Sequence, residues 1–147
     1  MTGSQVLPLA VVRVIEFTHR VMAPAAGLIL ADLGADVIKI EPVDGDSTRH
    51  LPGSGSGYFP MYNRNKRSLC VDLKSPDGLA AVQRLISKAD VLIENFRPGT
   101  MDRLGLGYAT LKVQYPRLIY CSETGLLAGP YEHRTALDEV AQMMGGL

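Results

Sequence analysis

The segment 94–99 reads Glu-Asn-Phe-Arg-Pro-Gly and follows an apolar run with the composition of a buried strand. Asn95 offers an amide, Phe96 an aromatic face and Arg97 a positive charge. An adenine ring with attached phosphates needs contacts of these three kinds. A simple turn with an exposed arginine is the alternative, but a charged and aromatic strand end is unusual for a turn. The segment therefore favours a nucleotide-binding loop.

Positive charge is concentrated in a second segment, 63–67, which reads Asn-Arg-Asn-Lys-Arg and precedes another predicted strand. Arginine can bind a phosphate through two parallel N–H groups, so this segment could hold an anionic ligand. Charge runs are as often a solvated surface, and the sequence leaves the two interpretations equally open. Lys74, at the carboxyl end of the same strand, would add to the positive field there.

The segment 18–24 connects a predicted strand directly to a predicted helix, and a helix N-terminus in that position can bind an anion. The small residues Ala23, Ala25 and Ala26 would let a ligand approach the backbone closely. Residue types alone favour the simpler interpretation, in which the helix only packs against a sheet.

Three other kinds of site lack the required pattern. The glycine-rich stretch 53–57 follows no strand, lacks a final Lys-Ser or Lys-Thr and opens no obvious helix, which predicts a mobile linker or lid. His19, His50 and His133 are far apart and the two cysteines are not clustered, so no metal site is predicted. No G-x-S-x-G motif indicates a serine hydrolase.

These segments must be positioned by a fold, and five short runs rich in β-branched residues predict its strands. The runs are 11–17, 36–41, 69–73, 91–96 and 118–122. Most are almost continuously apolar, as in a sheet that is covered on both faces. Their alternation with helical stretches predicts an α/β fold with an open, mostly parallel sheet. Such sheets bind ligands beyond the carboxyl ends of their strands.

Helices are predicted between these strands. Residues 24–33 begin with a proline and stop at a glycine, and Ser75 is the predicted N-cap of a second helix. The second helix has one apolar stripe that is predicted to be buried, consisting of Leu79, Val82, Leu85 and Ile86. Residues 101–115 contain two glycines and predict two short pieces, while 137–144 predict a further helix with Thr135 as a candidate N-cap.

The composition is that of a globular domain. The 147 residues carry 15 Lys and Arg against 15 Asp and Glu, and 46% of them are hydrophobic. Balanced charge argues against a general nucleic-acid binder, and no apolar stretch is long enough to span a membrane. The first residues lack the pattern of a signal peptide. Cys70 and Cys121 lie in apolar runs and are predicted to be buried free thiols, so we expect a cytoplasmic protein without nucleic-acid or membrane partners.

An ordered series of motifs extends over nearly the whole chain. The series begins with VIEFTHRVMAPAAGLILADLGADVIKIEPVDGDSTR (14–49) and continues with YNRNKRS (62–68), VDLK (71–74), DVLIENFRPG (90–99), LG (104–105), YPRLIY (115–120) and ALDEVAQ (136–142). In this order the motifs resemble the class III coenzyme A transferases, the L-carnitine dehydratase/bile-acid-inducible protein family. Formyl-CoA transferase and alpha-methylacyl-CoA racemase belong to that family.

The resemblance implies a Rossmann-like CoA-binding domain with helices on both faces of its sheet, in an enzyme whose full-length chains interlock as homodimers. Coenzyme A, or an acyl-CoA, would be a substrate and not a permanently bound cofactor. By position, the resemblance implies contacts with the thioester from Val21 and Met22, with the nucleotide from Val71, Asp72, Leu73, Lys74, Asn95, Phe96 and Arg97, with a phosphate from Arg103, and with the pantetheine end from the loop around Thr124.

The chain departs from this family at positions that bear on the reaction. Val21, Pro42 and Thr124 stand where formyl-CoA transferase has a glutamine, an arginine and a lysine. Because valine cannot donate a hydrogen bond, the oxalate and formate substrate pair is not expected. Leu137 stands where the racemase has an acid–base histidine, and leucine cannot carry a proton. These departures favour transfer of CoA to a carboxylic acid over racemisation.

Transferases of this family attack the acyl-CoA with an aspartate carboxylate, forming a mixed anhydride and then an aspartyl-CoA thioester. The resemblance implies that this aspartate lies beyond Leu147. Asp138 is a second candidate, although a charge interaction in the first turn of its helix explains it as well. Residues 1–147 are therefore expected to be the incomplete N-terminal CoA-binding domain of a CoA-transferase, inactive alone and without the second domain. A racemase and a non-catalytic nucleotide-binding module are the alternatives.

Overall fold

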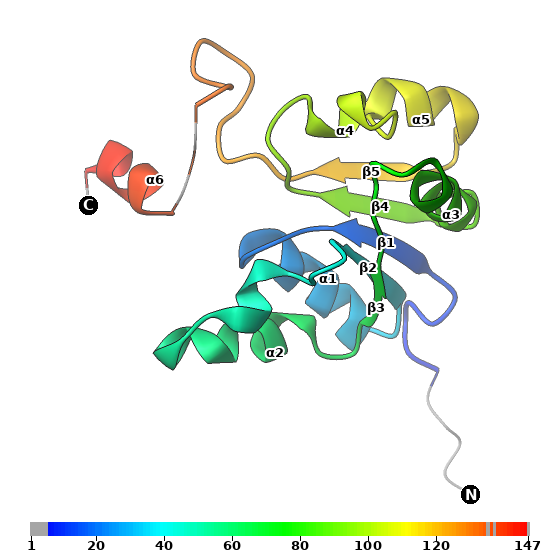
Figure 1. Ribbon diagram of the computed structural model, residues 1–147, viewed down its shortest axis with the longest axis horizontal. Coiled ribbons are helices and arrows are strands. Elements are labelled where there is room, and N and C mark those ends of the chain that lie inside the picture. The colour runs from blue at the N-terminus through cyan, green and yellow to red at the C-terminus, as the bar shows by residue number, and fades with distance from the viewer. Residues whose placement is uncertain (1–5, 135, 137, 147) are drawn as a thin grey trace, which may run out of the picture.

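The computed structural model describes residues 6–134, 136 and 138–146. Within these residues, five parallel strands form one sheet in the order β3–β2–β1–β4–β5 (Figure 1). The strands are β1 Arg13–Phe17, β2 Asp36–Glu41, β3 Arg67–Cys70, β4 Val91–Glu94 and β5 Ile119–Ser122. The prediction of an open parallel α/β sheet is confirmed.

The strand order places one reversal of direction at the centre of the sheet. The chain adds β2 and β3 on one side of β1, then crosses back and adds β4 and β5 on the other side. β1 and β4 are therefore neighbours in the sheet, and their last residues, Phe17 and Glu94, are paired in register. Parallel sheets bind ligands outside the carboxyl ends of their strands at such a reversal. The loops that follow Phe17 and Glu94 are thus where this fold predicts a site.

Helices cover both faces of the sheet (Figure 1). One side carries α1 Met22–Asp32 and, packed against it, α2 Tyr58–Asn63. The other side carries α3 Pro76–Ile86, α4 Thr100–Arg103 and α5 Tyr108–Gln114. This two-sided cover agrees with the prediction from the apolar strands.

Two further parts of the chain lie outside these layers. The 3₁₀ turns Ser47–His50 and Gly53–Gly57 connect β2 to α2. The helix α6, Asp138–Gly145, follows β5 after a long loop and stands apart from the sheet in Figure 1. It overlaps the helix predicted at 137–144, while Thr135 lies outside the described residues.

The start of α3 matches the sequence signals. Ser75 Oγ accepts a hydrogen bond from the Gly78 N–H at 3.0 Å, and Pro76 occupies the first helical position. Two residues of the predicted stripe are buried in the core and two are half-buried against it, namely Val82 and Ile86, and Leu79 and Leu85. The predicted stripe is therefore confirmed.

The sheet face toward α3, α4 and α5, here called the apolar face, carries the larger core. Its strand residues are Ile15, Phe17, Ile38, Ile40 and Leu92. The helices and the turn between α4 and α5 add Val82, Ile86, Met101, Leu106 and Leu111. Burying one such large side chain contributes roughly 1.5–3 kcal/mol, so this face is a major source of hydrophobic stabilisation.

The opposite face changes character along its strands. It carries a smaller apolar cluster, in which Val14 and Val37 lie near the amino ends of β1 and β2 and Ile93 lies beside Glu16; the other members are Ala23, Ala31 and Ala35. Near the carboxyl ends of β1 and β2 this face carries Glu16, Lys39 and Glu41, each no more than 1% exposed. We call this carboxyl half, which α1 and the loop after β2 cover, the charged face.

Several predicted boundaries differ from the structure. β1 begins at Arg13, two residues later than predicted, and β4 ends at Glu94, two residues earlier than predicted. β3 is displaced toward the N-terminus, because residues 71–75 leave the sheet and cross toward α3 (Figure 1). α1 begins at Met22, earlier than the proline that was expected to start it.

Two predictions are wrong. The stretch Gly53–Gly57 is a 3₁₀ turn that leads into α2, a helix that the sequence did not predict. Cys70 and Cys121 are free but exposed, because the strands that contain them, β3 and β5, form the two edges of the sheet. An edge strand has a neighbour on one side only, so its side chains are less covered. Within the described residues, no helix combines the length and apolar character needed to cross a membrane.

Candidate functional site

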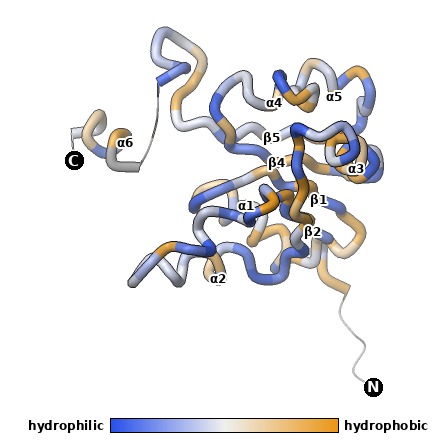
Figure 2. The backbone as a smooth tube through the Cα atoms, viewed as in Figure 1, coloured by the Kyte–Doolittle hydropathy of each residue, from blue (hydrophilic) through white to orange (hydrophobic). Residues whose placement is uncertain are grey.

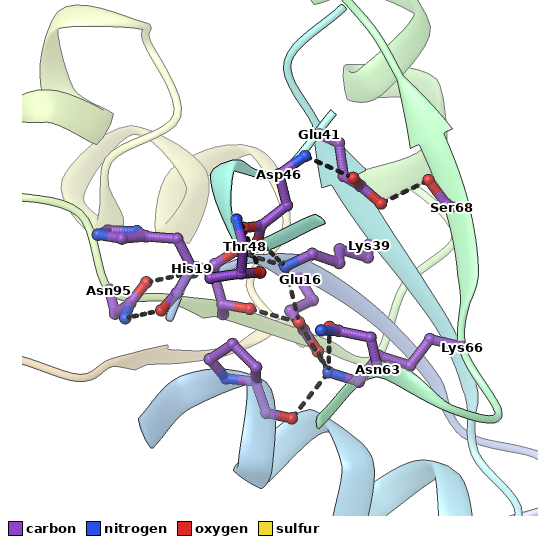
Figure 3. Close-up of polar contacts among 12 residues, drawn as sticks. Glu16, His19, Lys39, Glu41, Asp46, Thr48, Asn63, Lys66, Ser68 and Asn95 are labelled. Atoms are coloured by element: carbon purple, nitrogen blue, oxygen red, sulfur yellow. Dashed lines mark hydrogen bonds and ion pairs between the residues drawn. The ribbon is translucent and has the colours of Figure 1, made fainter. Parts of the chain in front are cut away.

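The loop between β1 and α1 is tied to the loop after β4 by two hydrogen bonds. Asn95 Oδ1 accepts from the His19 backbone N–H at 3.0 Å, and Asn95 Nδ2 donates to the His19 carbonyl oxygen at 3.0 Å (Figure 3). Because one amide satisfies both backbone groups of one residue, the two loops are held in a fixed relation. The structure thus brings together two of the segments singled out in the sequence.

Aromatic rings line the same junction. The Phe96 ring lies 6.4 Å from the Phe17 ring in an edge-on arrangement and 5.9 Å from the His19 ring, measured between centroids. Burial lowers the pKa of His19, and the charges of Arg20 and Lys39 act in the same direction against the opposing charge of Asp46. The His19 ring is therefore favoured in its neutral form beside Phe96.

The next residues form the start of α1. Arg20 has a φ of 67°, a left-handed conformation that is uncommon for a residue with a side chain. Val21 is half-buried and Met22 is exposed. No side chain caps α1 at Val21, which leaves N–H groups of its first turn without a side-chain acceptor. This loop can therefore offer backbone donors and a small apolar surface to a ligand.

An open cleft of about 650 Å³ lies beside the carboxyl end of β4. Phe96, Arg97 and Thr124 line it, so three residues implied by the family resemblance face one space. Its other lining residues include Glu94, Tyr108 and Tyr120. Burial, together with the charges of Glu94 and Asp102, raises the pKa of Tyr120, which keeps its hydroxyl protonated.

A second cleft of similar size, about 660 Å³, lies at the amino ends of the strands and is lined by 86–90 and 114–119. Volume alone does not separate the two clefts. The first is the candidate ligand site, because parallel sheets bind ligands at their carboxyl ends and the loop after β4, which Asn95 ties to His19, lines this cleft.

Of the 15 Lys and Arg residues, all of which the structure describes, six form salt bridges with other described residues and nine do not. The six are Arg13, Lys39, Arg49, Arg64, Lys66 and Arg67. In the same part of the chain, no carboxylate lies within 4.0 Å of the side-chain nitrogens of Lys74, Arg97 or Arg103. Arg103 Nη2 instead donates to Thr100 Oγ1 at 3.0 Å. Lys74 and Arg97, in the segments after β3 and β4, and Arg103, at the end of α4, are thus among the cations available to an anionic ligand.

The segment after β3, residues 71–75, contributes to packing and also to the surface at the carboxyl ends of the strands. Val71 and Leu73 are half-buried against the core of the apolar face. Asp72 Oδ1 accepts from the Lys74 backbone N–H at 2.8 Å, a short turn that leaves the Lys74 side chain exposed. Val71 and Leu73 therefore stabilise the fold, and Lys74 is the residue of this segment with free charge.

Thr124 lies in the loop after β5. It is exposed, and its Oγ1 donates to the Leu126 carbonyl oxygen at 3.1 Å. It faces the cleft, as the resemblance implies for the loop near the pantetheine end.

The cluster 63–67 matches the solvated-surface interpretation in part, because Arg64 and Arg67 are exposed, but the side chain of Lys66 is buried. Lys66 Nζ lies 2.9 Å from Glu16 Oε2 with its side chain 2% exposed, while Arg64 and Arg67 pair with Asp32 and Asp36. This turn is among the most hydrophilic stretches of the chain (Figure 2). Its charges nevertheless bind other parts of the protein, neither a ligand nor only water.

The sequence reasoning missed a group of buried polar residues at the carboxyl ends of β1 and β2, drawn in Figure 3. The group comprises Glu16, Thr18, Lys39, Asp46, Thr48, Asn63 and Lys66. A signal was present, because Glu16 and Lys39 interrupt apolar runs that were predicted to be buried strands. A charge inside a buried strand requires a partner, which the sequence alone did not name.

Two other candidates concern a metal site and Asp138. The described residues contain no group of three or more His, Cys, Asp or Glu side chains that could hold a metal ion. Asp138 starts α6, but its side chain lies outside what the structure describes.

Known proteins resemble this chain in sequence. The CoA-transferase family III matches residues 9–147. A succinate–glutarate CoA-transferase of Agrobacterium fabrum is 44% identical over 151 residues, which covers 95% of this chain and 38% of the relative. A formyl-CoA:oxalate CoA-transferase of Bradyrhizobium is 44% identical over 140 residues, covering 92% of this chain and 33% of that protein. The chain thus spans little more than a third of these relatives.

Solved structures agree in fold. A hypothetical protein of Mycobacterium tuberculosis superimposes with a TM-score of 0.90 at 41% identity, covering 95% of this chain and 40% of its own. A CAIB/BAIF family protein of Brucella suis gives 0.89 at 43% identity, with 97% and 40% covered. Both the sequence match and the shared fold extend over almost every residue of this chain. The chain belongs to CoA-transferase family III.

Proposed function

We propose that this chain supplies the CoA-binding part of a CoA-transferase, which moves CoA from an acyl-CoA to a carboxylic acid. One observation carries the proposal most directly. Of the nine cations without salt bridges in the described part of the chain, Lys74 follows the carboxyl end of β3, while Arg97 and Arg103 follow β4, which lies at the reversal of strand order. Unpaired cations at that place suit the phosphates of CoA.

The proposed arrangement follows the clamped loops. Phe96 offers its ring to the adenine, and Lys74, Arg97 and Arg103 neutralise the phosphates. Asn95 holds the β1–α1 loop so that Val21 and Met22 reach the thioester end. Val71, Asp72 and Leu73 form the segment beside the nucleotide, and the loop around Thr124 approaches the pantetheine arm. The open cleft of about 650 Å³ is large enough for part of such a ligand.

The reaction proposed for the whole enzyme begins with an aspartate carboxylate attacking the thioester carbonyl. The C–S bond breaks, CoA leaves as a thiolate and a mixed anhydride forms. The thiolate then attacks the aspartyl carbonyl and releases the donor acid. The acceptor carboxylate attacks the resulting aspartyl-CoA thioester, which frees the CoA thiolate and forms a second mixed anhydride. The thiolate finally attacks the acceptor's acyl carbonyl, giving the new acyl-CoA and the free aspartate carboxylate. In this proposal the aspartate and the second domain lie outside these 147 residues. Support comes from the relatives, which are named as CoA-transferases.

We place this enzyme in the cytoplasm as a homodimer. Cys70 and Cys121 are free thiols, which fits a reducing compartment. The interlocked dimer is carried over from the family resemblance, and gel filtration with light scattering of the full-length protein tests it.

Calorimetric titration of the full-length protein with CoA tests the binding proposal. Lys74→Ala and Arg97→Ala should each weaken CoA binding by about tenfold, because each removes one charge-assisted contact. Arg117→Ala is the matched control, since Arg117 is an exposed cation that lines the other cleft. Absence of heat at millimolar CoA in a folded sample would contradict the proposal.

A transfer assay addresses the chemistry. Succinyl-CoA with glutarate and formyl-CoA with oxalate are the pairs that the names of two relatives suggest. Exchange of the α-proton of a 2-methylacyl-CoA for deuterium, without transfer to an acid, would favour a racemase instead.

A further inference from the structure

The β1–α1 loop is held from beneath by two buried ammonium groups. The side chains of Lys39 and Lys66 are 1% and 2% exposed, and both reach the charged face under α1 (Figure 3). A lysine is almost never buried to this degree unless it has partners. The partners of these two ammonium groups therefore indicate why both lysines are buried.

Lys39 binds the loop where it leaves β1. Its Nζ donates to the Thr18 carbonyl oxygen at 2.6 Å. The same ammonium lies 3.0 Å from Asp46 Oδ2 and 3.6 Å from Glu16 Oε1. The backbone of Thr18 is thus fixed by a charge that two carboxylates hold in place.

Lys66 binds the first turn of α1, directly after the loop. Its Nζ donates to the Pro24 carbonyl oxygen at 2.7 Å and to Asn63 Oδ1 at 3.3 Å. It also lies 2.9 Å from both carboxylate oxygens of Glu16. Glu16 therefore links the two ammonium groups, and through them the two ends of the loop.

The third anchor is the Asn95 amide, which fixes both backbone groups of His19. Between the anchors stands Arg20, with its φ of 67°. A left-handed backbone at a residue with a side chain costs on the order of 1 kcal/mol and persists only where the surroundings impose it. The anchors on either side provide that constraint.

We propose that Lys39 and Lys66 are positioning residues, whose contacts with the Thr18 and Pro24 carbonyl oxygens set the geometry of the loop at the thioester end of CoA. The inference rests on the proposed function, because it takes from there the place of the thioester. Neither lysine touches the substrate in this account. Their effect passes through the backbone of the loop that carries Val21 and Met22.

Replacing either lysine should affect turnover much more than substrate binding. Lys39→Met and Lys66→Met in the full-length enzyme should lower kcat by about tenfold or more, because a small displacement of reacting groups is costly. The KM for acyl-CoA should change by less than roughly threefold, since Lys74 and Arg97 still hold the phosphates. Assays use the acyl-CoA and acid pair that the wild type turns over fastest.

Ile86→Ala is the matched control for lost stability. Ile86 is 1% exposed in the core of the apolar face, at the end of α3 beside the other cleft. Its truncation should lower the free energy of unfolding by about as much as Lys39→Met or Lys66→Met does. It should leave kcat and KM of the folded enzyme unchanged. If folded Lys39→Met and Lys66→Met enzymes behave like this control, the positioning role is refuted.

Asp46→Asn provides a gentler variant if the lysine variants do not fold. It keeps the shape of the side chain but weakens the hold on Lys39. Amide hydrogen exchange at residues 18–22 should then become faster than in the wild type, and it should not do so in Ile86→Ala. Unchanged exchange would overturn the inference. Failure of the wild type to bind CoA would instead refute the proposed function, since the exchange measurement needs no ligand.

Discussion

The two faces of the sheet are formed by the same strands but bury different kinds of side chain. The apolar face packs large side chains such as Phe17 and Leu92 beneath α3, α4 and α5. The charged face, one residue away along each strand, buries Glu16, Lys39 and Glu41 beneath α1 and the loop after β2. Side chains alternate between faces in a strand, so β1 and β2 serve both at once.

The two faces differ in how strictly their interactions fix the positions of particular atoms. Hydrophobic burial is favourable in many arrangements of similar volume, so the apolar face stabilises the fold without fixing particular backbone atoms. Charges in a buried site require specific partners, and here those partners include the carbonyl oxygens of Thr18 and Pro24. The apolar face therefore supplies stability, and the charged face supplies the position of a loop.

The largest expected effect comes from removing the carboxylate that the two lysines share. Glu16→Gln should lower the free energy of unfolding by about 3–5 kcal/mol, because it leaves Lys66 without a carboxylate partner and Lys39 with Asp46 alone. Urea denaturation followed by circular dichroism measures the change. A loss below about 1 kcal/mol would mean that the charged face is not a tightly coupled unit.

The pH dependence of the free energy of unfolding should report on the ion pair between Glu41 and Arg49. Burial alone would raise the pKa of Glu41, but hydrogen bonds from Arg49, Ser68 and the Asp46 backbone N–H lower it from 4.5 to about 2. A carboxyl with a lowered pKa in the folded state stabilises the fold above its unfolded pKa and loses that contribution as the pH falls. We expect stability to decrease by up to about 3 kcal/mol between pH 4.5 and pH 2 from this residue.

Arg49→Met separates this contribution from those of other carboxyls. Without the guanidinium, which lies 2.7 Å from Glu41 Oε2, the folded pKa of Glu41 should rise and the acid-dependent loss should shrink. Urea titrations at a series of pH values compare the two proteins. Parallel pH profiles would show that Glu41 is not responsible.

A smaller effect tests the packing of α1 on the charged face. In most helices Gly→Ala stabilises by about 1 kcal/mol. A Cβ at Gly27, however, would lie 1.8 Å from Glu16 Oε2. Gly27→Ala should therefore destabilise the protein by about 2 kcal/mol, since either α1 or the carboxylate must move. A stabilised variant in thermal unfolding would show that α1 does not approach Glu16 this closely.

Sequence reasoning predicted the parts of the fold that depend on local pattern. The apolar runs of β1, β2 and β4 and the Ser75 cap of α3 are recognisable because hydrophobic burial and capping leave characteristic residues. It failed for α2, where the preceding Gly-Ser stretch resembles a linker, and for the cysteines, whose exposure depends on which strands form the edges. Strand order is a property of the whole chain and has no local signal.

The candidate site was predictable to a similar degree. The composition of Asn95, Phe96 and Arg97 indicated a binding loop, and the structure places this loop against the β1–α1 loop. The positive run at 63–67 was misleading, because its partners Asp32, Glu16 and Asp36 come from distant positions in the sequence. Whether a charge is free or paired can be decided only once those segments are folded together.

Amide hydrogen exchange of the full-length protein, with and without saturating CoA, tests the central claim most directly. The account predicts slower exchange with CoA in residues 18–22, 71–75 and 95–99, at the carboxyl ends of the strands. It predicts no change in 86–90 and 114–119, which line the cleft at the other end. Slower exchange only in the segments that line the second cleft, or unchanged exchange in all of 18–22, 71–75 and 95–99, would contradict the account.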